Sequence, residues 1–301
     1  MAKRLGGVFA PVVTTYDRAG AVETGAFRAN IRAHLAAGLD GVVLCGSTGE
    51  NPLVDDAERR TLLEAARAEV PRDKWLIMAT GAESTRQAIA RTADAARLGA
   101  DAALVVSPHY YTPSMTPEVL RAHFTAVADA ARIPVLLYNI PKYVHFSLAP
   151  ALVGELARHP NIQGMKDSSG DLALLGQYLG AQGDAFTVLT GAGHLLHEGL
   201  RLGARGGIVA VSLFTGGMAR AVHDAFARGD EAEAARLQSV LLPLGKEIVG
   251  LMGVPAIKLA LDRVGLVGGP VRGPLLPLDA VGAARVDALL AEAGLGVGAA
   301  A

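Results

Sequence analysis

Lys166 is the residue of this sequence best placed to act as a nucleophile. The chain has six lysines, and only Lys166 ends an apolar segment, residues 162–166, of the kind that forms a buried strand. An amine with an ordinary pKa of about 10.4 is almost entirely protonated at neutral pH, and burial favours its neutral, nucleophilic form. We therefore expect Lys166 to form a Schiff base with a carbonyl substrate. A solvated ammonium, or an ion pair with Asp167, is the alternative.

Tyr138 supplies a second reactive group at the end of another apolar segment, residues 134–138. Its phenol can pass protons to and from an alcohol, a carbinolamine or a departing carbonyl oxygen. A buried structural tyrosine bound to the backbone is the alternative. If the two segments are neighbouring parallel strands, Tyr138 and Lys166 meet at the same edge of the sheet, and we expect them to work together.

A glycine-flanked turn, GSTGE at 46–50, follows a third apolar segment. Ser47 and Thr48 offer two hydroxyls and successive backbone N–H groups, which can hold a carboxylate without a full positive charge. Such turns also occur as ordinary loops. We interpret Glu50 as a helix cap or structural acceptor rather than a base, because an acidic residue just before a helix commonly has that role.

The elements that position these residues alternate in type along the chain. Short apolar segments predict strands at residues 8–13, 41–45, 75–80, 102–106, 134–138, 162–166, 186–190 and 207–211. Amphipathic segments between them predict helices at residues 24–37, 55–70, 84–98, 116–130, 148–157, 171–179, 194–201 and 215–228. Eight such repeats predict a (β/α)8 TIM barrel, in which the active site lies at the C-terminal ends of the strands. A doubly wound sheet in two domains is the less favoured alternative.

The alternation stops at Gly229, and residues 230–252, 255–264 and 279–293 predict helices without strands. We therefore divide the chain into a barrel, residues 1–229, and a C-terminal helical extension packed on it, residues 230–301.

Composition points to small-molecule chemistry. The 301 residues carry a net charge of −1 and contain no run of like charges, so we expect no nucleic-acid or membrane partner. Neither a signal-peptide pattern nor a long uncharged apolar stretch is present, and Cys45 is the single cysteine. These features predict a cytoplasmic protein.

Three motifs together carry a family resemblance: GSTGE at 46–50, YNIP at 138–141 and GMKDSSGD at 164–171. In this combination the sequence resembles the family of dihydrodipicolinate synthase and N-acetylneuraminate lyase. The likeness continues through residues 81–85, 99–102 and 268–272, and so spans residues 7–278. It implies a class I lyase that acts on a small, pyruvate-like 2-oxo acid without a cofactor or metal.

The resemblance also implies residue roles. Lys166 would form the imine, Tyr138 would shuttle the proton, and Thr48 would link Tyr138 to a second tyrosine. Tyr110 occupies the position of that second tyrosine, which in the family enters the site of a neighbouring subunit. Ser47 and Thr48 would also hold the keto-acid carboxylate. A homo-oligomer, dimer or tetramer, is therefore expected.

The motifs also differ between branches of the family. The synthase branch typically has an arginine where this chain has Tyr143, and Lys-Glu-Ala where this chain has residues 166–168. The form found here is similar to 4-hydroxy-2-oxoglutarate aldolases, in which the residue corresponding to Ser168 touches substrate. We therefore predict cleavage of 4-hydroxy-2-oxoglutarate to pyruvate and glyoxylate. Dihydrodipicolinate synthase and sugar-acid aldolases or dehydratases are the alternatives within the family.

Other function classes rest on weaker patterns. His194 and His197 have a spacing that could hold zinc, but no third ligand accompanies them, so we expect no metal site. Residues 191–193 lie where some barrels bind phosphate; the resemblance instead assigns Gly191 and its loop to the substrate site. A non-catalytic 2-oxo-acid binding protein remains a different class.

Overall fold

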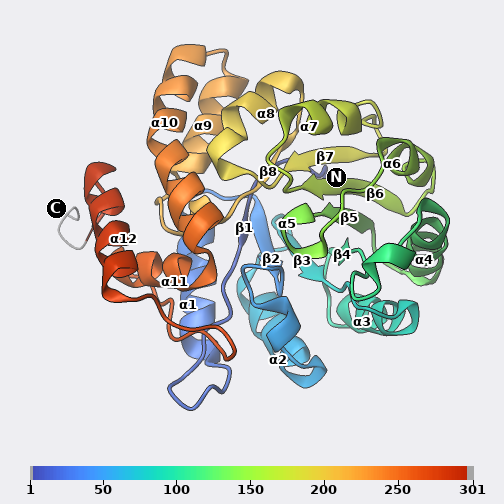
Figure 1. Cartoon of the computed structure of the whole chain (residues 1–301), viewed down its shortest axis with the longest axis horizontal. Helices are drawn as coiled ribbons and strands as arrows, with labels where there is room; N and C mark the ends of the chain where they lie inside the picture. The colour runs from blue at the N-terminus through green and yellow to red at the C-terminus, as the bar shows by residue number, and fades with distance from the viewer. Residues whose placement is uncertain (1–2, 297–301) are drawn as a thin grey trace.

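The computed structural model describes residues 3–296, and its centre is a closed barrel of eight parallel strands in the order β1 to β8 (Figure 1). The strands are β1 Gly7–Pro11, β2 Gly41–Leu44, β3 Trp75–Ala79, β4 Ala102–Val106, β5 Val135–Asn139, β6 Ile162–Asp167, β7 Thr187–Thr190 and β8 Gly206–Ile208. Pairing of β1 with β8 closes the barrel. The predicted (β/α)8 fold is confirmed.

Helices surround the barrel, as Figure 1 shows. They are α1 Thr24–Ala36, α2 Asp56–Glu69, α3 Thr85–Arg97, α4 Pro117–Ala130, α6 Pro150–Leu156, α7 Leu172–Leu179, α8 Leu196–Leu202 and α9 Met218–Ala227. Several begin where the sequence offers a capping side chain: Asp55 and Glu58 form a capping box at α2, and Ser84 accepts from Gln87 N at α3. No helix among the described residues is long and apolar enough to cross a membrane.

The C-terminal helices are α10 Glu231–Pro243, η5 Leu244–Met252, α11 Val254–Arg263 and α12 Ala280–Glu292. Their apolar side chains join the core of the barrel: Leu241, Leu261 and Leu289 belong to the same buried cluster as Val8 and Ala10 of β1. The helices therefore pack on one side of the barrel, as Figure 1 shows for α10 to α12. The division of the chain at residue 229 stays a prediction.

Two local departures from the predicted elements lie close to the barrel mouth. The segment predicted as one helix, 230–252, is α10 followed by a π-helix, η5; Pro243 lacks an amide N–H and interrupts the α-helical hydrogen bonding at this junction. β8 ends at Ile208, and a 3₁₀ helix, η4 Ala210–Leu213, replaces the end of the predicted strand. A short helix that was not predicted, α5 Pro141–Val144, follows β5.

Candidate active site

Lys166 and Tyr138 meet across the pairing of β5 with β6. The two residues are register partners, and Lys166 Nζ donates to the Tyr138 hydroxyl oxygen at 3.3 Å. Lys166 Nζ also lies 4.5 Å from the centroid of the Tyr138 ring. Both side chains are buried, with exposed fractions of 6% and 4%. Lys166 is therefore a desolvated amine beside a proton donor and acceptor, and the solvated alternative is excluded.

Asp167 points away from Lys166, because successive side chains of a strand alternate between its two faces. Its carboxylate accepts from Asn139 Nδ2 at 2.8 Å and from Ser169 Oγ at 2.8 Å. Burial raises the pKa of Asp167, and the hydrogen bonds from Asn139 and Ser169 partly oppose that rise. The backbone carbonyl of Asn139 also accepts from Ser168 N at 2.8 Å. This buried cluster fixes the loop that carries Ser168.

The turn with Ser47 and Thr48 is held in an unusual backbone conformation. Cys45 and Glu50, at its two ends, have left-handed φ angles of 51° and 57° although neither is glycine. Such conformations cost free energy and persist only where the surroundings enforce them. Here Asn51 Nδ2 donates to Cys45 O at 2.6 Å. The turn places Ser47 Oγ 3.4 Å from the Tyr138 hydroxyl, so Ser47, and not Thr48 as expected, is the residue of the turn that contacts Tyr138 within this chain. The hydroxyls of Ser47 and Tyr138 and the amine of Lys166 form a row.

Glu50 has the structural role that its position suggested. Its carboxylate lies 2.5 Å from Lys258 Nζ, with both side chains almost fully buried, and it accepts from Arg272 N at 2.9 Å. Lys258 also donates to Pro270 O at 2.7 Å. Burial lowers the pKa of Lys258, while the nearby Glu50 carboxylate acts in the opposite direction. The pair joins the Ser47–Thr48 turn to the C-terminal segment, and it is the feature of the turn that sequence reasoning missed.

A cavity of about 240 Å³ opens in front of Lys166. The end around the amine is lined by the predicted residues Ser47, Thr48, Tyr138, Ser168 and Gly191. Gly191 is needed for this packing, because a Cβ atom there would lie 1.9 Å from Ser168 Oγ and 2.8 Å from Lys166 Cε. The structure therefore brings six of the seven predicted site residues together.

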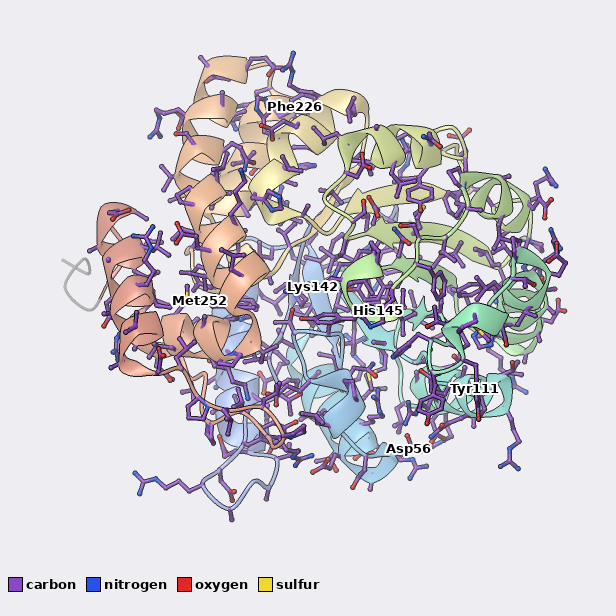
Figure 2. All side chains as sticks on the ribbon, in the orientation of Figure 1. Asp56, Tyr111, Lys142, His145, Phe226 and Met252 are labelled. Atoms are coloured by element: carbon purple, nitrogen blue, oxygen red, sulfur yellow. The ribbon has the colours of Figure 1, made fainter. Side chains whose placement is uncertain are left out.

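Tyr110 is the predicted residue that stands apart. Its side chain is 77% exposed, and its backbone N–H donates to Glu83 at 2.8 Å. Its ring packs edge-on against Tyr111, with centroids 5.0 Å apart. Figure 2 shows Tyr111 beside α3 and α4, well away from Lys142. Within a single chain Tyr110 does not line the Lys166 cavity, and its action in a neighbouring subunit stays a prediction.

The two histidines considered as zinc ligands have different surroundings. His194 lines the Lys166 cavity, and burial, together with the positive charge of Lys246, lowers its pKa. His197 is buried, does not line the cavity, and has its Nε2 2.8 Å from Glu231 Oε2. Within residues 3–296, no three His, Cys, Asp or Glu side chains are grouped as metal ligands.

Another part of the cavity lining was not predicted. It consists of Lys142 and Tyr143 from α5, His194, and the π-helix residues Gly245, Val249 and Gly250. Lys142 lies between α5 and the orange C-terminal helices (Figure 2). The sequence signals were present: a lysine directly after the YNIP motif, and three glycines, 245, 250 and 253, in an otherwise helical segment.

Comparison with known proteins gives consistent matches over nearly the whole chain. A 4-hydroxy-tetrahydrodipicolinate synthase of Synechococcus sp. is 38% identical over 276 residues, 91% of this chain and 90% of that protein. The same-named protein of an Exiguobacterium sp. is 37% identical over 281 residues, 93% and 95% of the two chains. The structure of YagE, a prophage protein of the dihydrodipicolinic acid synthase family from E. coli K12 in complex with pyruvate, superimposes with a TM-score of 0.91 at 31% identity, covering 96% and 99%.

These relatives overturn one prediction. The expected cleavage of 4-hydroxy-2-oxoglutarate was wrong, because curated relatives that cover most of the chain are 4-hydroxy-tetrahydrodipicolinate synthases. That prediction rested on Tyr143, which stands where the synthase branch has arginine, and on the form of residues 166–168. The predicted class, a Schiff-base-forming carbon–carbon lyase, is confirmed. Since the sequence pattern of the Dihydrodipicolinate synthetase family matches residues 4–293, the chain belongs to that family.

Proposed function

We propose that the protein condenses pyruvate with aspartate semialdehyde, the reaction of a 4-hydroxy-tetrahydrodipicolinate synthase. The observation that carries the proposal is the buried Lys166 amine, 3.3 Å from the Tyr138 hydroxyl, at the end of a cavity lined by small polar groups. The names of the relatives support the choice of second substrate. A complex of YagE with pyruvate supports the first.

The first half of the reaction builds an imine on Lys166. The neutral amine attacks the keto carbon of pyruvate, the carbonyl oxygen takes a proton, and the carbinolamine then loses water. Tyr138 is positioned to give and take these protons, because its oxygen lies within hydrogen-bond reach of Nζ. Ser47 and Thr48 would bind the pyruvate carboxylate with hydroxyls and backbone N–H groups, which leaves no competing cation beside the amine.

The second half forms the carbon–carbon bond. Loss of a methyl proton converts the imine to an enamine, whose carbon attacks the aldehyde of the second substrate. The aldehyde oxygen takes a proton. The amino group of the second substrate then attacks the imine carbon, which closes the ring of the product and releases the Lys166 amine. Tyr138 and Ser47 form the row of hydroxyls that can return these protons. We further propose that Tyr110 of a neighbouring subunit extends this row, so that the active unit is at least a dimer.

A substrate panel tests the proposal. Purified protein is supplied with pyruvate and either aspartate semialdehyde or an uncharged aldehyde of similar length, and the condensation products are quantified by mass spectrometry. We expect the specificity constant for aspartate semialdehyde to be at least about tenfold larger than that for the uncharged aldehyde, because the carboxylate of the semialdehyde adds charge-assisted binding. A preference for the uncharged aldehyde would contradict the synthase reaction and favour a sugar-acid aldolase. Lys166→Ala protein is the control.

A further inference from the structure

We infer that Lys142 binds a carboxylate at the end of the substrate that is remote from the imine, and thereby selects dicarboxylate products. The inference deepens the proposed function, because it concerns the same cavity. It assigns the charge that Tyr143 cannot supply to a different residue of the same helix.

The charges around the cavity are one-sided. Among the described residues that line it, two carry ammonium groups, Lys142 and Lys166, and none carries a carboxylate. Lys166 is consumed when the imine forms. Since His194 has its pKa lowered by burial, it favours the neutral form, and Lys142 is the remaining fixed cation of the lining. A bound substrate with a second carboxylate would meet its counter-charge there.

Lys142 is an exposed residue whose side chain is tethered to the cavity wall. Its Nζ donates to Gly250 O in the π-helix η5 at 2.7 Å, and lies 5.5 Å from the centroid of the Tyr143 ring. An ammonium has three N–H donors, so two remain for a substrate carboxylate. Figure 2 shows the residue between α5 and the C-terminal helices. This hydrogen bond favours one position of the ammonium before substrate binds, which lowers the cost of binding.

Tyr143 cannot provide this charge. Burial, together with the nearby Tyr138 phenol, raises the pKa of Tyr143, so it remains a neutral hydroxyl. Lys142 also lines a second, largely apolar cavity of about 560 Å³ that shares Tyr138, Ile140 and Tyr143 with the first. Lys142 thus lies where the two cavities adjoin, so we infer that a substrate extending from Lys166 toward the second cavity can reach its ammonium.

The test compares two seven-carbon 2-oxo acids that differ at the remote end. 2-Oxopimelate carries a terminal carboxylate, and 2-oxoheptanoate ends in a methyl group. Both can form an imine with Lys166, which borohydride traps, and the half-saturating concentration of each is read from the extent of trapping by intact-protein mass spectrometry. For wild-type protein we expect the half-saturating concentration of 2-oxopimelate to be at least about tenfold lower than that of 2-oxoheptanoate. Lys142→Met protein should lose this preference. Its half-saturating concentration of pyruvate should stay within about twofold of the wild-type value.

Matched variants separate a direct contact from a general field effect. Lys142→Arg should retain most of the preference for 2-oxopimelate. Lys246→Met should retain it too, because Lys246 is an exposed lysine of the π-helix η5 that does not line the cavity. If Lys142→Met does not fold, Lys142→Gln replaces it, because its amide can still donate to Gly250 O. Equal half-saturation of the two acids in the wild type, or an unchanged preference in Lys142→Met, would overturn the inference. Neither result depends on whether aspartate semialdehyde is a substrate, so the proposed function fails or stands separately.

Discussion

Tyr138 and Lys166 are direct register partners on β5 and β6, and this pairing puts a phenol oxygen 3.3 Å from the amine that would form the imine. The C-terminal ends of neighbouring parallel strands lie side by side, so the two groups converge without any loop having to move. Both residues thus lie on paired strands of the closed barrel rather than on loops, which favours precise placement of the reacting atoms.

Tyr138→Phe removes the hydroxyl and keeps the ring. We expect the turnover number for condensation to fall about 10²- to 10⁴-fold, the range typical of a lost general acid or base. Steady-state kinetics with saturating pyruvate measure the effect. The control is Tyr178→Phe, since the buried Tyr178 hydroxyl donates to Leu148 O at 2.7 Å, away from the cavity. Tyr138→Phe protein with more than a tenth of wild-type turnover would show that another group moves the proton.

Gly191→Ala tests the close packing beneath the substrate. The added methyl group would lie 1.9 Å from Ser168 Oγ and 2.8 Å from Lys166 Cε, so one of these side chains must move. We expect a loss of about 100-fold or more in specificity constant, because displacements of about 1 Å in a catalytic group can cost that much. Gly154→Ala is the matched control: it lies in α6, where an added Cβ meets no atom within 4 Å, and activity should be unchanged. Equal kinetics for both variants would contradict the assigned role of Gly191.

The buried pair of Glu50 and Lys258 should stabilise the fold and the Ser47–Thr48 turn. Glu50→Gln leaves the Lys258 ammonium buried without a counter-charge, and we expect the free energy of unfolding to fall by about 3 to 5 kcal/mol. Equilibrium unfolding in urea measures the change in the free energy of unfolding. Asp287→Asn breaks the half-exposed pair with Arg263 and should cost less than about 1 kcal/mol. If Glu50→Gln costs no more than Asp287→Asn, the pair is not the anchor of the turn.

Most of the barrel was predictable because strands buried on both faces give continuous apolar segments. The meeting of Tyr138 and Lys166 was predictable for the same reason, because each residue ends one of two such segments and the segments form neighbouring parallel strands. The part of the cavity lining that contains Lys142 was not predictable, since Lys142 and its acceptor Gly250 are 108 residues apart in sequence and meet only through the packing of the C-terminal helices. The same holds for Glu50 and the Arg272 backbone, 222 residues apart. The differences at Tyr143 and at residues 166–168 misled the choice of reaction.

Tyr110 should act in a neighbouring subunit, because its exposed ring does not line the cavity of its own chain. Mixing Tyr110→Phe protein with Lys166→Ala protein creates mixed dimers in which one site has both groups intact. We expect activity to reappear after subunit exchange, although each variant alone is nearly inactive. Tyr111→Phe serves as the control and should be active without mixing. Native mass spectrometry confirms that the subunits have exchanged. If activity does not recover once they have, Tyr110 acts within its own chain.

The covalent intermediate gives the most direct test of the mechanism. Protein incubated with pyruvate and borohydride is digested, and the labelled peptide is sequenced by tandem mass spectrometry. We predict one reduced pyruvyl adduct per chain, on Lys166, and none in Lys166→Ala protein, whose thermal unfolding should remain near that of the wild type. The buried Lys258, which is paired with Glu50, should stay unlabelled. An adduct on a different lysine, or full activity without any adduct, would contradict the Schiff-base mechanism.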